Sequence, residues 1–146
     1  MTLRTLTALA AALLLAAPAL IAPALAATEH FHADMAGPSE VPANTTAGTG
    51  TVDATLDTAT KKLDYTVTWS NLTGPATMAH IHGPAAAGKN AGVIVPLGDS
   101  PASPIKGTAA LTDAQIAALE NGMYYVNVHT DAHKGGEIRG QLTKAP

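Results

Sequence analysis

The sequence predicts an all-β domain: a Greek-key β-sandwich or flattened barrel of about eight short antiparallel strands with one short helix. Apolar and polar residues alternate with a period of two through most of the chain after residue 27, which is typical of half-buried strands. The alternating runs are separated by turns rich in the 13 glycines and 10 prolines of the sequence. A length of 146 residues indicates a single domain.

The first 26 residues have the composition of a secretory signal peptide. Arg4 is their only charged residue, an Ala- and Leu-rich run follows it, and A-L-A at positions 24–26 fits a cleavage site. An uncleaved membrane anchor is the alternative, which Pro18 and Pro23 disfavour because they would interrupt a spanning helix. We therefore expect a domain at residues 27–146 that is periplasmic or secreted, with membrane contact only through the signal peptide.

The strands can be placed from the alternation. The first begins at Thr28 and puts His30 and His32 on the face opposite Phe31. A hairpin follows, in which residues 51–56 and 63–69 pair across a turn at residues 57–60. Further strands are expected at residues 76–82, 92–97, 105–110, 123–129 and 136–142.

A single helix is predicted between the strand at residues 105–110 and the strand at residues 123–129. Thr112 and Gln115 have the spacing of a capping box, in which each side chain satisfies a free backbone amide of the first turn. Leu119 contributes to the apolar face, and Asn121-Gly122 ends the helix, because glycine accepts the left-handed conformation at a C-terminus.

Charge and cysteine content exclude several functions. The chain has 8 basic and 11 acidic residues, a formal charge of −3, so it lacks the positive surface that nucleic-acid binding needs. It has no cysteine, which excludes disulfides, thiolate metal sites and cysteine nucleophiles. Any metal site must therefore use histidine, carboxylate or tyrosine.

All six histidines lie after residue 27, and they form three groups. His80 and His82 are two apart in a predicted strand, so they project from one face with backbones about 6.5 to 7 Å apart, close enough to share a metal. His129 on a neighbouring strand, and His133 four residues later, extend the candidate set. The predicted metal ligands are His80, His82, His129 and His133.

The other histidine pair and the surrounding polar residues have less defined roles. His30 and His32 could complete this site, form a second and weaker one, or decorate an edge strand, which we favour. Asp131 is a candidate to orient a ligating ring by accepting its second N–H, or else it stabilises a turn. Within residues 125–129, Val126 and Val128 take the inward positions, so the residues between them are expected to face outward.

Copper is the metal that best matches an all-imidazole site, because it stands highest in the affinity order for nitrogen ligands. Zinc and iron also accept neutral imidazoles, and Tyr124 or Tyr125 would offer iron an oxygen donor.

Three charged residues are interpreted as structural. Glu40 fixes a loop, and Glu137 and Arg139 pair with opposite charges on a partner strand.

Several of these segments together resemble the CHRD domain family, named after its occurrence in chordin. They are E-V-P at 40–42, A-H-I-H-G-P-A at 79–85, Y-V-N-V-H-T at 125–130, and His133 followed by G-G-E-I-R-G-Q-L at 135–142. The similarity covers about residues 31–142, and Lys134 stands where the family usually has proline. The resemblance implies the fold and export. It does not imply an activity, because no single function defines the family, and in chordin the domain is part of a protein that binds growth factors.

A weaker resemblance links the chain to copper-zinc superoxide dismutases, which are Greek-key sandwiches that hold copper with an H-x-H pair and a late histidine. It implies that His80, His82 and His129 are the copper ligands. The chain has no histidine between residues 83 and 128 to bind zinc, and it lacks the cysteines of the dismutase disulfide. A bimetallic enzyme is therefore disfavoured, and a copper-only relative is the remaining enzymatic alternative.

Together these features predict an exported metal-binding protein that sequesters or delivers copper or supports redox chemistry. The alternative from a different class is a non-catalytic protein–protein interaction module without a metal. Whether the chain is an enzyme is left open, with the balance toward a non-enzyme. Exposed edge strands could pair into a dimer, although nothing in the sequence requires one.

Overall fold

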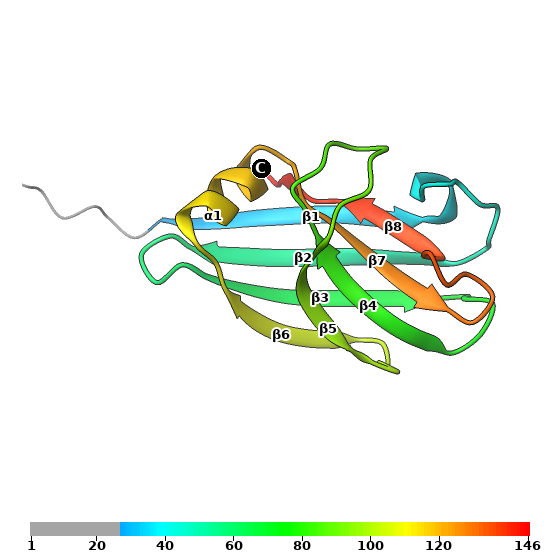
Figure 1. The fold of residues 1–146 in the computed structure, drawn as a ribbon. Helices are drawn as coiled ribbons and strands as arrows, with labels where there is room; N and C mark the ends of the chain where they lie inside the picture. Colours follow the sequence, from blue (N-terminus) through cyan, green and yellow to red (C-terminus); the bar gives the residue numbers. More distant parts are fainter. Residues whose placement is uncertain (1–26) are drawn as a thin grey trace, which may run out of the picture.

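The structure is a computed structural model that describes residues 27–146 (Figure 1). The predicted signal peptide, residues 1–26, lies outside the described residues. Within the described range, none of the helices combines the length and apolar character needed to span a membrane. The strands are β1 (Thr28–Ala36), β2 (Thr49–Asp57), β3 (Lys62–Ser70), β4 (Ala76–His82), β5 (Val93–Asp99), β6 (Ile105–Ala110), β7 (Tyr125–Thr130), β8 (Ile138–Gln141) and β9 (Thr143–Lys144); the helices are η1 (Gly37–Ser39) and α1 (Asp113–Glu120).

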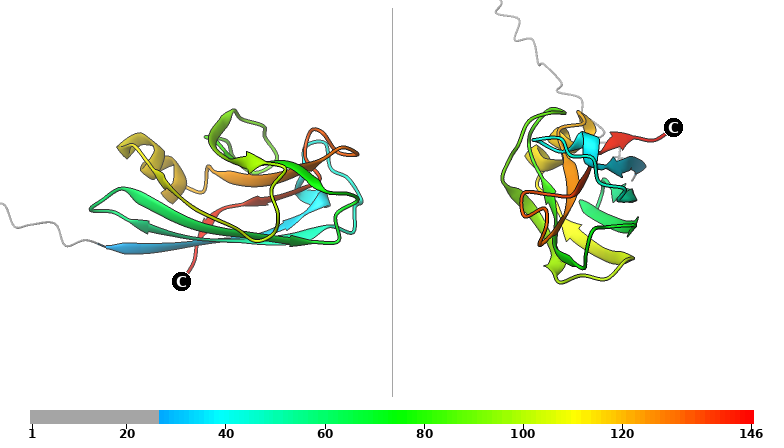
Figure 2. Two further views of the ribbon diagram at one scale, coloured as in Figure 1. Left: turned by 90° about the horizontal axis from the view of Figure 1, so that it is seen from below. Right: turned by 90° about the vertical axis from the view of Figure 1, so that its right-hand side faces the viewer.

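The strands form one sheet that folds over on itself. Neighbouring strands follow the order β5-β4-β7-β8-β1-β2-β3-β6, all pairs are antiparallel, and β9 pairs with β1. The views in Figure 2 show β4, β7 and β8 in one layer above β1, β2 and β3 in the other. The end strands β5 and β6 touch, so the barrel is nearly closed. This confirms the predicted all-β sandwich or flattened barrel with one short helix.

The core lies between the two layers and contains the residues that the alternation assigned to it. In β2 and β3, Leu56 faces Leu63 and Val52 faces Val67, and all four are fully buried. The other layer contributes residues at most 1% exposed: Ile81, Val126, Val128 and Ile138. Burying each such side chain contributes about 1.5–3 kcal/mol, and small residues let the layers approach closely.

Helix α1 follows the predicted signals at both ends. The Thr112 side chain accepts from the Gln115 amide, and the Gln115 side chain accepts from the Thr112 amide, which is the predicted capping box. Leu119 is fully buried against the core. Asn121 caps the C-terminus and Gly122 has a φ of 67°, the left-handed conformation that glycine accepts.

The outer face of β7 differs from the expectation. Tyr125, Asn127 and His129 do point away from the core, but they are buried rather than solvated. The connection between β4 and β5, residues 83–92, lies over this face, and we call it the cover loop (Figure 2). Its Ala91 amide donates to the Tyr125 hydroxyl. The face is therefore a polar compartment under a loop, which strand periodicity alone does not reveal.

Candidate metal centre

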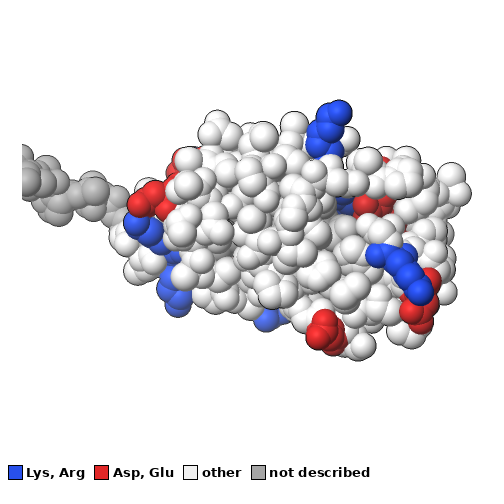
Figure 3. Space-filling view, viewed as in Figure 1, with Lys and Arg blue, Asp and Glu red and all other residues white. Residues whose placement is uncertain are grey.

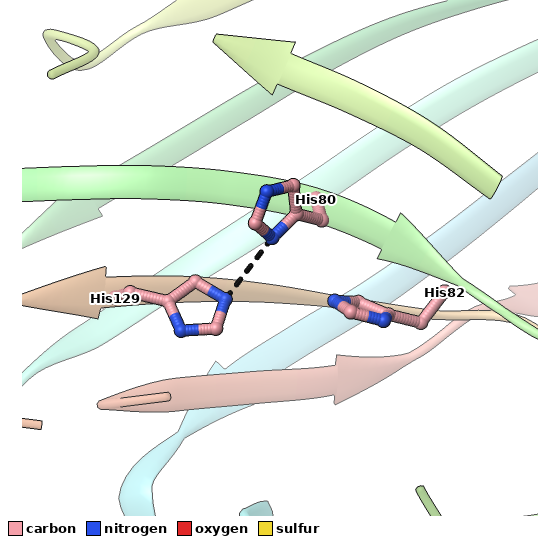
Figure 4. Close-up of side chains that lie close together, drawn as sticks. All are labelled: His80, His82 and His129. Atoms are coloured by element: carbon pink, nitrogen blue, oxygen red, sulfur yellow. Dashed lines mark hydrogen bonds between the residues drawn. The ribbon is translucent and has the colours of Figure 1, made fainter. Parts of the chain in front are cut away.

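Two neighbouring strands bring three histidines together. His80 and His82 lie on one face of β4, and Ile81 between them is buried in the core. Strand β7 pairs with β4 so that Asn127 lies opposite His80, which places His129 on the same face. Figure 4 shows the three imidazoles gathered over these two strands. The i, i+2 spacing and the antiparallel register thus create the cluster.

The nitrogen atoms of the cluster are close enough to share one ion if the three rings move toward one another. One nitrogen from each of His80, His82 and His129 lies within 4.8 Å of the other two. The closest pair, Nδ1 of His80 and Nε2 of His129, is 3.1 Å apart. Two nitrogens bound to one ion at about 2.0–2.1 Å lie at most about 4.2 Å apart. A pair at the 4.8 Å limit therefore has to close by about 0.6 Å for a linear nitrogen–metal–nitrogen angle, and by about 1.4 Å for a tetrahedral one.

Backbone carbonyls fix the orientation of two of the rings. Nδ1 of His82 donates to the Ala91 carbonyl, and Nδ1 of His129 donates to the Lys134 carbonyl, both at 3.0 Å. A carbonyl can only accept, so Nδ1 carries the proton in both rings and Nε2 presents a lone pair. Nε2 of His82 is buried and has no hydrogen-bond partner. The lone pair of His82 therefore has no partner, whereas that of His129 accepts a hydrogen bond from Nδ1 of His80.

Burial favours the uncharged, metal-binding form of two histidines in the cluster. Burial lowers the pKa of His80, and the neighbouring His129 and His82 lower it further. Burial also lowers the pKa of His129, although the Lys134 carbonyl opposes this effect. The surface over β4 and β5 has few charged side chains, and those visible lie toward its margins (Figure 3). The lowered pKa values therefore favour neutral imidazoles at His80 and His129.

The structure does not bring the two other C-terminal candidates into the cluster. His133 lies in the turn after β7, where its amide hydrogen-bonds to Thr130, and its ring is outside the three-histidine group. Asp131 is exposed in the same turn. The hydrogen bond to the second nitrogen of His129, expected from Asp131, comes instead from the main chain of Lys134.

His30 and His32 lie on β1 in the other layer and outside the three-histidine group. Nδ1 of His32 is 2.8 Å from the Asp53 carboxylate and Nε2 is 3.4 Å from that of Asp34. The hydrogen bond with Asp53 raises the pKa of His32 despite the opposing effect of burial, and Asp34 adds to the increase. His30 hydrogen-bonds to Thr55. This pair belongs to an open polar face of β1 and β2.

Sequence reasoning missed the role of Tyr125 and Arg139 at the cluster. The Tyr125 ring stacks on that of His82, with centroids 4.8 Å apart and planes inclined by 4°. The Arg139 guanidinium lies over the other face of Tyr125, 3.4 Å from its centroid. The available signal was that Arg139 is the sole arginine after residue 4 and stands in a strand between apolar and glycine residues.

Glu40 is a second buried polar group on this face. It is 5% exposed, and its Oε1 has no hydrogen-bond partner. Burial raises the pKa of Glu40 to about 7, although the Val41 amide, the charge of Arg139 and the Asn127 side chain oppose the shift. Gly136 makes room for it, since a Cβ there would collide with Oε1 of Glu40. Glu40 does more than fix a loop, because it carries a titratable group into the covered compartment.

Comparison with known proteins places this arrangement in a family. The family model of the CHRD domain matches residues 31–142. The chain belongs to the CHRD domain family. The CHRD segment includes both layers of the sandwich, the three clustered histidines and Arg139. No curated protein and no solved structure matches the chain significantly.

Proposed function

We propose that this CHRD domain is exported and binds one transition-metal ion, copper in the first place, through His80, His82 and His129. The observation that carries the proposal is the buried, unpartnered Nε2 of His82 beside two further imidazole nitrogens. A buried polar atom without a partner costs about 1–3 kcal/mol, and a metal bond at that position would remove the cost. The ligand atoms would be Nδ1 of His80 and Nε2 of His82 and His129.

The donor set favours copper among the candidate metals. All three donors are uncharged imidazoles, which suit copper, zinc and iron, and copper binds such nitrogen sites most strongly. The hydrogen bonds from His82 and His129 to main-chain carbonyls resemble the outer contacts that orient metal-bound histidines in general. Zinc and iron remain alternatives, which a competition experiment separates.

The environment of the three ligands favours holding the ion over rapid turnover. His82 and His129 are 9% and 7% exposed, whereas His80 is partly exposed at the edge of the cluster. Sequestration or delivery needs a protected site with one accessible side, which this arrangement provides. Bound copper would supply one-electron redox chemistry, and the side at His80 is the route by which a small molecule would reach it. The proposed role is therefore copper storage or transfer, with redox chemistry as its extension.

Copper titration of the chain from Ala27 onward tests the proposal. We expect one equivalent of Cu(II) to bind and to give a paramagnetic resonance spectrum with nitrogen coupling. A His80→Ala, His82→Ala double variant should lose this signal. The matched control is a His30→Ala, His32→Ala double variant, which removes the equally spaced histidine pair on β1. It also tests whether copper binds to these histidines near the new N-terminus instead.

Two results would refute the proposal. One is the absence of stoichiometric binding in the wild-type chain, which would favour an interaction module without metal. The other is a copper signal that survives in the β4 double variant and disappears in the β1 control. Parallel titrations with Zn(II) and Fe(II), with Cu(I) under reducing conditions, rank the metals.

A further inference from the structure

We infer that Arg139 is a positioning residue of the metal centre, which acts through Tyr125 and the cover loop to aim Nε2 of His82 at the ion. The inference rests on the proposed function and extends it to residues that would not touch the metal. It assigns a purpose to a buried guanidinium that has no role in the core between the two layers.

A stack of three planar groups connects Arg139 to the ligand. The guanidinium lies 3.4 Å from the centroid of the Tyr125 ring, and the His82 ring is nearly parallel to Tyr125 on the other side. Such a cation–π contact is strongest when it is desolvated, and Arg139 is only 2% exposed. The stack limits rotation of His82 about its Cβ–Cγ bond, so the plane of the imidazole is set by Arg139 and Tyr125.

Arg139 also holds the part of the cover loop that selects the His82 tautomer. It donates from one nitrogen to Oδ1 of Asn90 and from another to the Lys89 carbonyl. The carbonyl of the next residue, Ala91, accepts a hydrogen bond from Nδ1–H of His82. The Ala91 amide donates to the Tyr125 hydroxyl. With residues 89–90 anchored, the Ala91 carbonyl stays in place and Nε2 of His82 stays unprotonated.

The choice of arginine supports a positioning role. A buried charge is expensive unless it is paired and hydrogen-bonded, so an apolar residue would serve a purely structural position better. The hydrogen bonds of the Arg139 side chain go to the cover loop, and the nearby carboxyl group is the buried Glu40. A planar guanidinium can stack on a ring and donate in two directions at once, which a lysine ammonium cannot.

The test compares the wild-type chain with Arg139→Lys, which keeps the positive charge and loses the planar guanidinium that stacks on Tyr125 and donates in two directions. Long-range ¹H–¹⁵N spectra of the metal-free protein report the tautomer of His82, and copper titration reports affinity and release rate. We expect Arg139→Lys to mix the two His82 tautomers, to weaken copper binding about 10–100-fold and to change the nitrogen coupling. Lys62→Met, an exposed change on β3, is the control.

A second variant keeps the inference testable if Arg139→Lys does not fold. Tyr125→Phe removes only the hydroxyl that accepts from Ala91, and Tyr65→Phe on the other layer is its matched control. Tyr125→Phe should also raise the share of the second tautomer, whereas Tyr65→Phe should not.

The outcomes separate the inference from the proposed function. If Arg139→Lys folds and leaves the His82 tautomer, the copper affinity and the spectrum unchanged, the inference is overturned while the metal site stands. If Arg139→Lys does not fold, the same unchanged result in Tyr125→Phe overturns it. Failure of the wild-type chain to bind copper would overturn the proposed function. In that case the tautomer measurement still decides whether Arg139 orients His82.

Discussion

Glu137 is fully buried where three connections of the sandwich meet, and its replacement by glutamine measures the strength of that junction. Oε1 accepts from the Thr46 hydroxyl at 2.6 Å and the Thr73 amide at 2.8 Å. Oε2 accepts from the hydroxyls of Thr73 at 2.7 Å and Thr130 at 2.6 Å. Burial alone would raise the pKa of Glu137, but the hydrogen bonds from Thr130, Thr46 and Thr73 outweigh it and lower the pKa to about 2.

The shift fixes the size and sign of a pH effect on stability. A fall from the ordinary 4.5 to about 2 corresponds to about 3 kcal/mol. Because the folded pKa is depressed, this stabilisation is fully present above pH 4.5 and is lost as the pH falls toward 2. Glu137→Gln lacks the charge, and its amide nitrogen cannot accept the hydrogen bonds made to Oε2. We expect a loss of about 2–4 kcal/mol at pH 7.

Urea unfolding of both proteins at pH 7, 4, 3 and 2.5 measures the free energy of unfolding. The gap between wild type and Glu137→Gln should narrow steadily below pH 4.5, whereas exposed Glu120→Gln should show no gap of this size. A gap that stays constant from pH 7 to pH 2.5 would show that the carboxylate is not held ionised by the three threonines.

Three further predictions concern the covered face. Because the pKa of Glu40 is raised to about 7, wild-type stability should fall by about 3 kcal/mol as the pH rises from 4.5 to 7, and Glu40→Gln should abolish this fall; an identical pH profile in both proteins would contradict it. Gly136→Ala should destabilise the fold by more than about 1 kcal/mol, since φ is 131° and the new Cβ would meet Glu40; unfolding by denaturant checks this, with exposed Gly135→Ala as the control. The lowered pKa values of His80 and His129 predict that copper affinity declines only below the ordinary histidine pKa of 6.5, and a loss beginning near pH 8 would argue against it.

The fold was predictable because its signals are local. Alternation assigned Leu56 and Leu63 to the core, and the capping box marked the start of α1. Alternation also placed the H-x-H pair and His129 on the faces opposite buried aliphatic residues, but the pairing of β4 with β7 is a long-range contact that no local signal encodes. What periodicity supplies is the face on which a side chain projects.

The covered environment of the site was not predictable in the same way. The cover loop is rich in alanine and glycine without a repeating pattern, so nothing in its sequence shows that it folds over β7. The contact to His129 comes from the Lys134 carbonyl, a main-chain group that every residue has, whereas Asp131 offered a visible side chain. Stacking of Arg139 on Tyr125 depends on two strands meeting in register, which is a tertiary property.

The separation of the clustered histidines along the chain determines when a metal could be acquired. His80 and His129 are 49 residues apart and meet through the pairing of β4 with β7. A newly made, extended polypeptide therefore has no such site, and an ion would be taken up after the sandwich has assembled. A bound ion would then link β4 to β7 and slow their separation during local unfolding. The metal-bound protein should therefore be cleaved more slowly by a protease than the metal-free protein.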